Sequence, residues 1–250
     1  MRKNGFTLAE AMVTLGIIGV ISAISIPSLI NEYNKQVYTK SLQVAISDFE
    51  NAMGVMMMKE GVFSLVETEA WKHVRVKGDN YILRPGKSDS EDLKGFVSAI
   101  SKTLLIEEVD LNEKQLASYK MKYQGNEGSD GNYQVRTYTK KFGYFFAAGF
   151  PKENYGKKDD DAVMFLYIDV NGKRPPNYEG RDVFWYKVLN NGTLDPRVNI
   201  YNSPSRGELI NSNPLFLKPA TRENLREMCA KYKTTYCSYY LWKNGYKMDY

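Results

Sequence analysis

The sequence FTLAEAMVTLGIIGVISAISIPSLI, at residues 6–30, decides what kind of protein this chain forms. It contains no lysine or arginine and a single acid, Glu10. As a helix these residues extend about 37 Å at about 1.5 Å per residue, enough to cross a hydrocarbon core of about 30 Å. Arg2 and Lys3 precede the stretch, and such cations hold the adjoining end of a membrane helix in the cytoplasm. The sequence therefore predicts one membrane-spanning helix at 6–30.

A secretory signal peptide is the main alternative interpretation of this apolar stretch. Three observations argue against it. The stretch is longer than the roughly 7–15 residues of a signal-peptide core, and no A-x-A-like cleavage site precedes the polar pair Asn31-Glu32. It also carries Glu10, a carboxylate that a simple signal or anchor does not need. We therefore expect the helix to remain in the mature protein.

Glu10 requires a cationic partner. An ionised carboxylate inside an apolar membrane helix costs on the order of 2.5–3.5 kcal/mol, and such acids are usually paired. No cation lies within residues 6–30. The partner must come from the leader, from another chain, or from a new N-terminal amine produced by cleavage nearby.

MRKNG at residues 1–5, followed by this helix, resembles the class III leader and first helix of type IV pilins and type II secretion pseudopilins. The resemblance covers about the first 35 residues and rests on the leader and on Gly5, Phe6, Glu10, Gly19 and Pro27. It implies that a membrane aspartyl peptidase cuts between Gly5 and Phe6 and methylates the new amine. It also implies that Glu10 neutralises the Phe6 amine of a neighbouring subunit, which supplies the missing cation.

Gly19 and Pro27 also have local effects on the helix. Proline removes a backbone donor and clashes with the carbonyl four residues earlier, so the helix should kink or loosen around residues 23–27. Gly16 and Gly19 present small surfaces for close packing. Glycine and proline are also common in membrane helices generally. The resemblance implies that this region can melt when a subunit enters a filament.

The composition of the whole chain excludes several other classes. Its 250 residues are 43% apolar and 25% charged, and the mean hydropathy is −0.47, so it is neither a polytopic membrane protein nor a disordered chain. One histidine excludes HExxH zinc proteases and multi-histidine metal centres. The net charge of +5 is too small to imply nucleic acid by itself.

The periodicity beyond residue 30 predicts an α+β fold. Apolar residues at three- and four-residue steps extend the first helix to about Lys59, with an end at Gly61, and predict a second helix over roughly 92–106. Alternating runs predict strands at 133–139, 142–150, 162–170 and 183–189. We expect a small antiparallel sheet laid across the second half of the long helix, as in pilins. The expected parts are a leader at 1–5, a membrane or filament-core helix at 6–30 and a pilin-like globular domain at 31–250.

The segment 168–184 is dense in oxygen-bearing residues. Asp169, Asn171 and Asp182 are candidate Ca²⁺ ligands, together with Asn177 and Glu179, because Ca²⁺ takes six to eight oxygen ligands. The segment resembles a DxNG…GxD motif of pilin-like proteins. The alternative is a turn in which the two aspartates cap backbone amides, and this alternative is favoured.

The C-terminal region contains the two cysteines and several aromatic residues. Because the leader implies a domain outside the cytoplasm, and pilins often close a short C-terminal loop, we expect Cys229 and Cys237 to form a disulfide; free buried thiols are the alternative. The aromatic residues 239–250 suggest a stacking surface for sugar or single-stranded DNA. A closing hairpin at Asn244-Gly245 is the favoured interpretation.

The sequence predicts no enzyme, because no catalytic motif rises above background. It predicts a structural subunit of a type IV pilus-like or type II secretion filament. The subunit would be held in the inner membrane with its domain outside the cytoplasm. Its expected partners are other pilins or pseudopilins, the prepilin peptidase and methyltransferase, and an assembly platform in that membrane. The alternative is a minor pilin that acts as an adhesin or in DNA uptake.

Overall fold

The computed structural model describes most of the chain outside its first six residues. The described residues are 7–72, 75–77, 80–82, 95, 98–104, 108–110, 120–123, 126–129, 135–139, 144–149, 162–172, 174, 177–198, 200–203, 207–211, 217–232 and 236–250. They form two compact units, Met1–Val37 and Tyr38–Tyr250. Gly5 and Phe6 lie outside the described residues.

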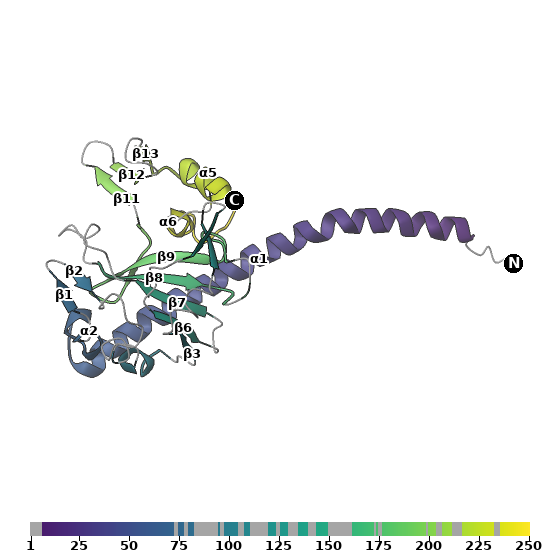
Figure 1. Ribbon diagram of the computed structural model, residues 1–250. Coiled ribbons are helices and arrows are strands. Elements are labelled where there is room, and N and C mark those ends of the chain that lie inside the picture. The colour runs from purple at the N-terminus through teal and green to yellow at the C-terminus, as the bar shows by residue number, and fades with distance from the viewer. Residues whose placement is uncertain are drawn as a thin grey trace. The chain divides into compact units, whose positions relative to one another are not determined.

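One long helix, α1 (Leu8–Glu60), contributes residues to both units (Figure 1). Residues 23–27 are helical in this structure despite Pro27. The helix ends in a Schellman motif at Gly61, where the φ angle is 69°. The N–H of Val62 donates to the carbonyl of Met57, and the N–H of Gly61 to that of Met58. The predicted end of the first helix is therefore confirmed.

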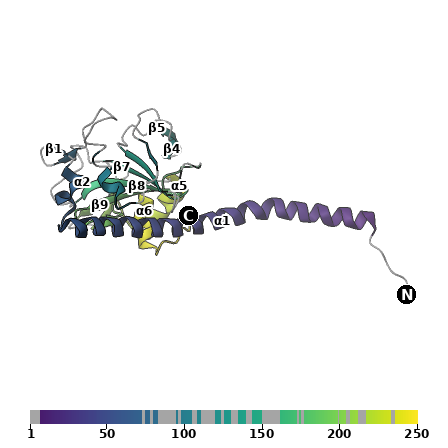
Figure 2. The same ribbon diagram turned by 90° about the horizontal axis from the view of Figure 1, so that it is seen from below.

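The second unit is built on an antiparallel six-stranded sheet with the order β10-β9-β8-β7-β6-β3. Its strands are β3 (Glu108–Asp110), β6 (Val135–Thr139), β7 (Tyr144–Gly149), β8 (Ala162–Asp169), β9 (Val183–Leu189) and β10 (Leu194–Asp195). The four longest match the predicted strands closely. The second half of α1 runs along one face of this sheet (Figure 2), so the predicted α+β fold is confirmed.

The remaining elements are short. They are η1 (Leu65–Glu67), α2 (Glu69–Lys72), β1 (Arg75–Lys77), β2 (Asn80–Ile82), β4 (Lys120–Tyr123), β5 (Asn126–Ser129), β11 (Ile200–Ser203), β12 (Gly207–Asn211), β13 (Leu217–Pro219), α5 (Arg222–Tyr232) and α6 (Tyr236–Lys243). β1 pairs with β2, β4 with β5, and β11–β13 form a three-stranded sheet. Of the helix expected over 92–106, residues 95 and 98–101 are helical.

The main core lies between α1 and the sheet. Helix residues Leu42, Phe49 and Met53 are buried there together with residues of β8 and β9 such as Leu166 and Phe184. The β9–β10 turn approaches α1 so closely that a Cβ at Gly192 would lie 2.9 Å from the Cβ of Met53. Only glycine fits here, also because its φ angle is 84°. The periodic apolar face of the helix thus packs as the sequence predicts.

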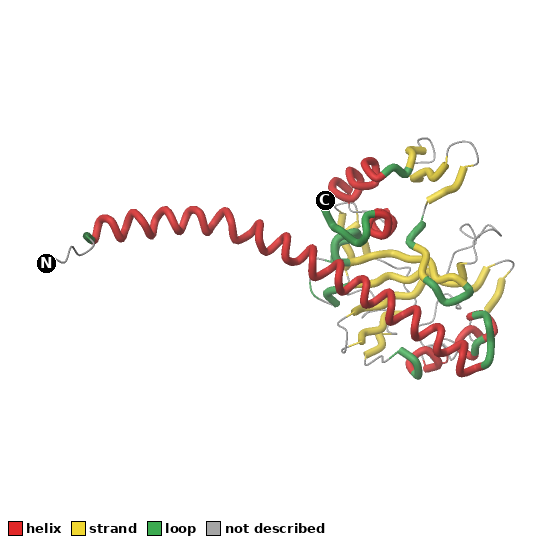
Figure 3. Tube along the Cα trace, turned by 180° about the vertical axis from the view of Figure 1, so that it is seen from behind, coloured by secondary structure: helices red, strands yellow, loops and turns green. Residues whose placement is uncertain are grey.

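The C-terminal hairpin predicted at Asn244-Gly245 is wrong, because the residues before this turn form a helix rather than a strand (Figure 3). α6 packs with α5 and β12 in a second buried cluster. The alternation of aromatic residues misled the prediction, since nearly every side chain of α6 is buried and its helical period is hidden. The hydroxyl of Ser238 on α6 accepts a hydrogen bond of 3.0 Å from the backbone N–H of Trp185 in β9.

Candidate functional site

The first turn of α1 is closed by a reciprocal pair of residues, Thr7 and Glu10. One carboxylate oxygen of Glu10 accepts hydrogen bonds from the backbone N–H of Thr7 at 2.9 Å and from its hydroxyl at 2.8 Å. The same hydroxyl accepts the backbone N–H of Glu10 at 3.2 Å. This is a capping box, which satisfies backbone donors that a helix start otherwise leaves free. Its signal, T-x-x-E, is present in the sequence but was not identified there.

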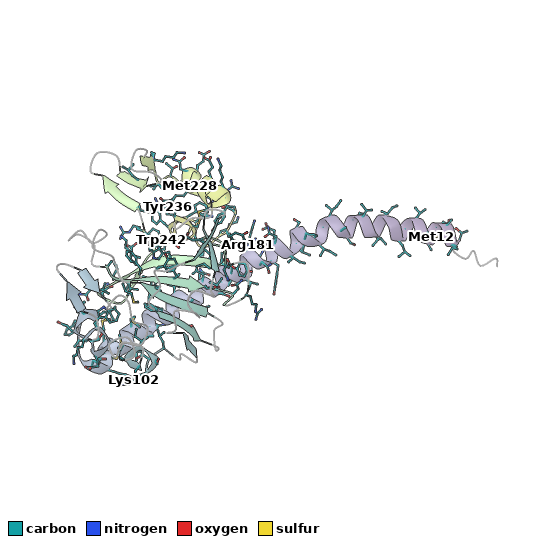
Figure 4. All side chains as sticks on the ribbon, in the orientation of Figure 1. Met12, Lys102, Arg181, Met228, Tyr236 and Trp242 are labelled. Carbon is teal, nitrogen blue, oxygen red and sulfur yellow. A yellow bond between two sulfur atoms is a disulfide. The ribbon has the colours of Figure 1, made fainter. Side chains whose placement is uncertain are left out.

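The apolar side chains that follow Glu10 project from α1 without cover from the rest of the chain (Figure 4). The most apolar 18-residue window of the helix has a mean hydropathy of 2.2 and is 0% buried. Leu8 is 79% exposed and Met12 67%. By length and composition, α1 is the one helix among the described residues that could cross a membrane. A face this apolar requires lipid or other protein around it.

The described part of α1 offers Glu10 no cation. The first cation along this helix is Lys35, which pairs with Glu32 at 2.7 Å. Thr7 supplies hydrogen bonds but no charge. The charge requirement inferred from the sequence therefore persists in the folded chain.

The comparison with known families bears directly on this segment. Residues 1–26 carry the prokaryotic N-terminal methylation motif. This motif is the prepilin-type signal of type IV pilins and pseudopilins, and it supports a pilin-like subunit that is processed at its N-terminus. The folded chain, a long apolar helix followed by a small antiparallel sheet domain, is consistent with a pilin-like fold. No curated protein and no solved structure matches the chain.

The predicted assembly residues fall in or beside this motif. Gly5 and Phe6 belong to the matched segment but lie outside the described residues. Glu10 and Gly19 belong to it and lie on α1, and a Cβ at Gly19 would meet nothing within 4 Å. Pro27 follows the last matched residue. Gly19 therefore has the open surface that close helix packing requires.

The loop between β8 and β9 brings Asn171 and Asp182 together, two of the predicted calcium ligands. One Asp182 oxygen accepts the Asn171 amide and the Asn177 backbone N–H, both at 2.9 Å, and the other accepts the Tyr178 N–H at 2.6 Å. Asp169 accepts the Asn171 N–H at 3.1 Å. These contacts are those of a turn closed by carboxylate acceptors.

The electrostatics of this loop are set by burial. Burial raises the pKa of the Asp182 carboxyl to about 6, against the lowering effect of its three N–H donors and of Arg181. Among the described residues, no group of three or more histidine, cysteine, aspartate or glutamate side chains is arranged to hold a metal ion. Buried amide oxygens of Asn171 and Asn177 have no hydrogen-bond partner. Calcium binding at this loop stays a prediction.

The C-terminal region contains the predicted disulfide, Cys229–Cys237, which joins α5 to α6. Both cysteines are buried. Of the aromatic residues suggested as a stacking surface, Tyr239 and Tyr240 are fully buried and Trp242 is exposed. Burial of these tyrosines in a core explains the aromatic C-terminus without a ligand.

Proposed function

We propose that this chain is a structural subunit of a type IV pilus-like or type II secretion filament. The observation that carries the proposal is the pairing of an N-terminal methylation motif with an apolar helix that nothing in the chain covers. The motif supports cleavage after Gly5 and N-methylation of Phe6. The uncovered helix supports a life in two surroundings, first the membrane and then a filament core.

Glu10 determines the axial position of each subunit in this proposal. Cleavage after Gly5 creates an ammonium group at Phe6, four residues from Glu10 along the chain. The carboxylate keeps one oxygen for its own Thr7 and offers the other to the Phe6 ammonium of a neighbouring copy. An ion pair in such apolar surroundings is strongly favoured over two separate charges, so only one axial offset satisfies every subunit.

The location and partners follow from the same features. Arg2 and Lys3 hold the leader in the cytoplasm, which places residues 38–250 on the other side of the inner membrane. The partners are a prepilin peptidase with its methyltransferase, other pilins or pseudopilins, and a membrane assembly platform. The oxidising environment of that side is compatible with the Cys229–Cys237 disulfide.

The proposal is tested by substituting the two acids at opposite ends of the apolar helix. Glu10→Ala should leave processing and membrane insertion largely intact while subunits recovered in sheared, sedimented filaments fall by about tenfold or more. Glu32→Ala is the matched control, because Glu32 is an exposed acid of the same helix that pairs with Lys35. Normal filament yield from Glu10→Ala would contradict the assembly role.

We also propose, as a separate and independent element, that the loop between β8 and β9 takes up Ca²⁺ through Asp169, Asn171 and Asp182. The two unpartnered amide oxygens beside Asp182 support it. Thermal unfolding of the full chain in detergent, with Ca²⁺ and with EDTA, is the test. A midpoint raised by Ca²⁺ in the wild type but not in Asn171→Ala is expected; equal midpoints in the wild type would overturn the proposal.

A further inference from the structure

The outward face of the second half of α1 is unusual for a surface helix. Between Ser41 and Met58, the exposed residues of α1 are Val44, Ser47, Asn51, Val55 and Met58. None of them is charged, although exposed helix faces are normally rich in charge. We call these five residues the outer seam.

The spacing of the outer seam suits a second helix. Its residues follow one another at steps of three, four, four and three, so they lie within an arc of about 80° on a helix of 3.6 residues per turn. The seam is about 21 Å long at about 1.5 Å per residue. Alternating steps of three and four are the pattern that packs one helix against another.

The polar members of the seam do not oppose burial. The amide of Asn51 donates to the hydroxyl of Ser47 at 3.3 Å, so these two groups satisfy part of each other's hydrogen bonding. Gly54 flanks the seam, and a Cβ there would meet nothing within 4 Å, which leaves room for close approach. Asp48, beside the seam, is half-buried. The apolar members remain open to solvent, at 47% for Val44, 40% for Val55 and 79% for Met58.

We propose that the outer seam binds the apolar helix, residues 8–30, of a second copy of this chain. That segment is the largest uncovered apolar surface among the described residues, and it carries no cation and a single acid at its far end. An uncharged seam and an uncharged helix match each other, whereas a charged partner would leave its charges unpaired. The inference rests on the proposed filament function and names the surface that receives the neighbouring helix.

A charge placed in the seam tests this contact. Val55→Lys should reduce the subunits recovered in sheared filaments by about tenfold or more, because an unpaired ammonium would be buried between helices. Ala230→Lys is the control, since Ala230 is an exposed apolar residue on α5. Val55→Leu should assemble normally. An unchanged unfolding temperature for Val55→Lys will confirm that its domain is folded.

Cysteine cross-linking identifies the occupant of the seam. Two differently tagged copies of the full chain are co-expressed, one with Val55→Cys and one with a single added cysteine at successive positions from 8 to 30. The native cysteines are already paired with each other. Disulfides between the two tags that recur every three or four positions support the proposal. Val55–Val55 disulfides alone, or no cross-links, would overturn it.

The outcomes separate this inference from the proposed function. If Val55→Lys assembles like the wild type while Glu10→Ala does not, the seam assignment is wrong and the filament function stands. If the wild-type chain is not cleaved after Gly5, the filament function itself fails.

Discussion

The first and second halves of α1 are equally helical, but their apolar side chains have different surroundings. Ile17 is 54% exposed and belongs to a stretch whose most apolar window is 0% buried, whereas Leu42 and Phe49 are almost completely buried against the sheet. The second half therefore gains its stability from its own domain. The first half must gain it from lipid or from other subunits, which is how one helix can serve folding and assembly separately.

The largest expected difference is in the response to losing an apolar side chain. Phe49→Ala should lower the free energy of unfolding by about 3–5 kcal/mol, because it leaves a cavity in the main core. Ile17→Ala should change it by less than about 0.5 kcal/mol. Denaturant unfolding of the full chain in detergent, followed by near-ultraviolet circular dichroism, measures both. Equal losses would show that the first half also belongs to the domain's core.

The second prediction concerns pH, and it places a titrating group in the domain alone. Burial raises the pKa of Asp182 from 3.8 to about 6, so between those values the folded chain binds more protons than the unfolded chain. Stability should therefore fall as pH rises from about 4 to about 6, by up to about 3 kcal/mol relative to Asp182→Asn. Unfolding of both proteins across this range measures the difference. A wild-type stability that rises relative to the variant would contradict the assignment.

The third prediction concerns the staple between α5 and α6. Its loop is short, with a sequence separation of 8 residues, so replacing both Cys229 and Cys237 by serine should lower the free energy of unfolding by about 2–3 kcal/mol. Reductant should destabilise the wild type by a similar amount and leave the variant unchanged. A variant that still responds to reductant would show that another thiol chemistry is involved.

The smallest effect is expected at the start of α1. Thr7→Ala removes the hydroxyl of the capping box and should weaken the first turn by about 1 kcal/mol. Amide hydrogen exchange of residues 8–11 in detergent should become about fivefold faster, while exchange in the core strands stays the same. Unchanged exchange at the helix start would mean that Glu10 is held by something other than Thr7.

These two regions also differ in how well the sequence predicted them. Residues 6–30 and the strands of the main sheet were predictable because their apolar periods are strong and local. α6 was not, because burial on nearly all its faces removes the helical period. The contacts of Asp182, and the hydrogen bond of 2.5 Å from the Tyr250 hydroxyl to the Gly180 carbonyl, depend on distant segments meeting. No local pattern encodes such meetings.

The processing site was predictable for a related reason. Glu10 is costly in a membrane helix, and its cost indicated a partner before any fold was known. The outer seam needed the structure, because the letters at 44–58 do not reveal which face the sheet covers.

The intact mass and N-terminal sequence of the mature protein test the central claim most directly. The account predicts a chain of residues 6–250 that begins with N-methylated Phe6 and contains one disulfide. A mature chain that begins at Met1, or beyond residue 25, would contradict it.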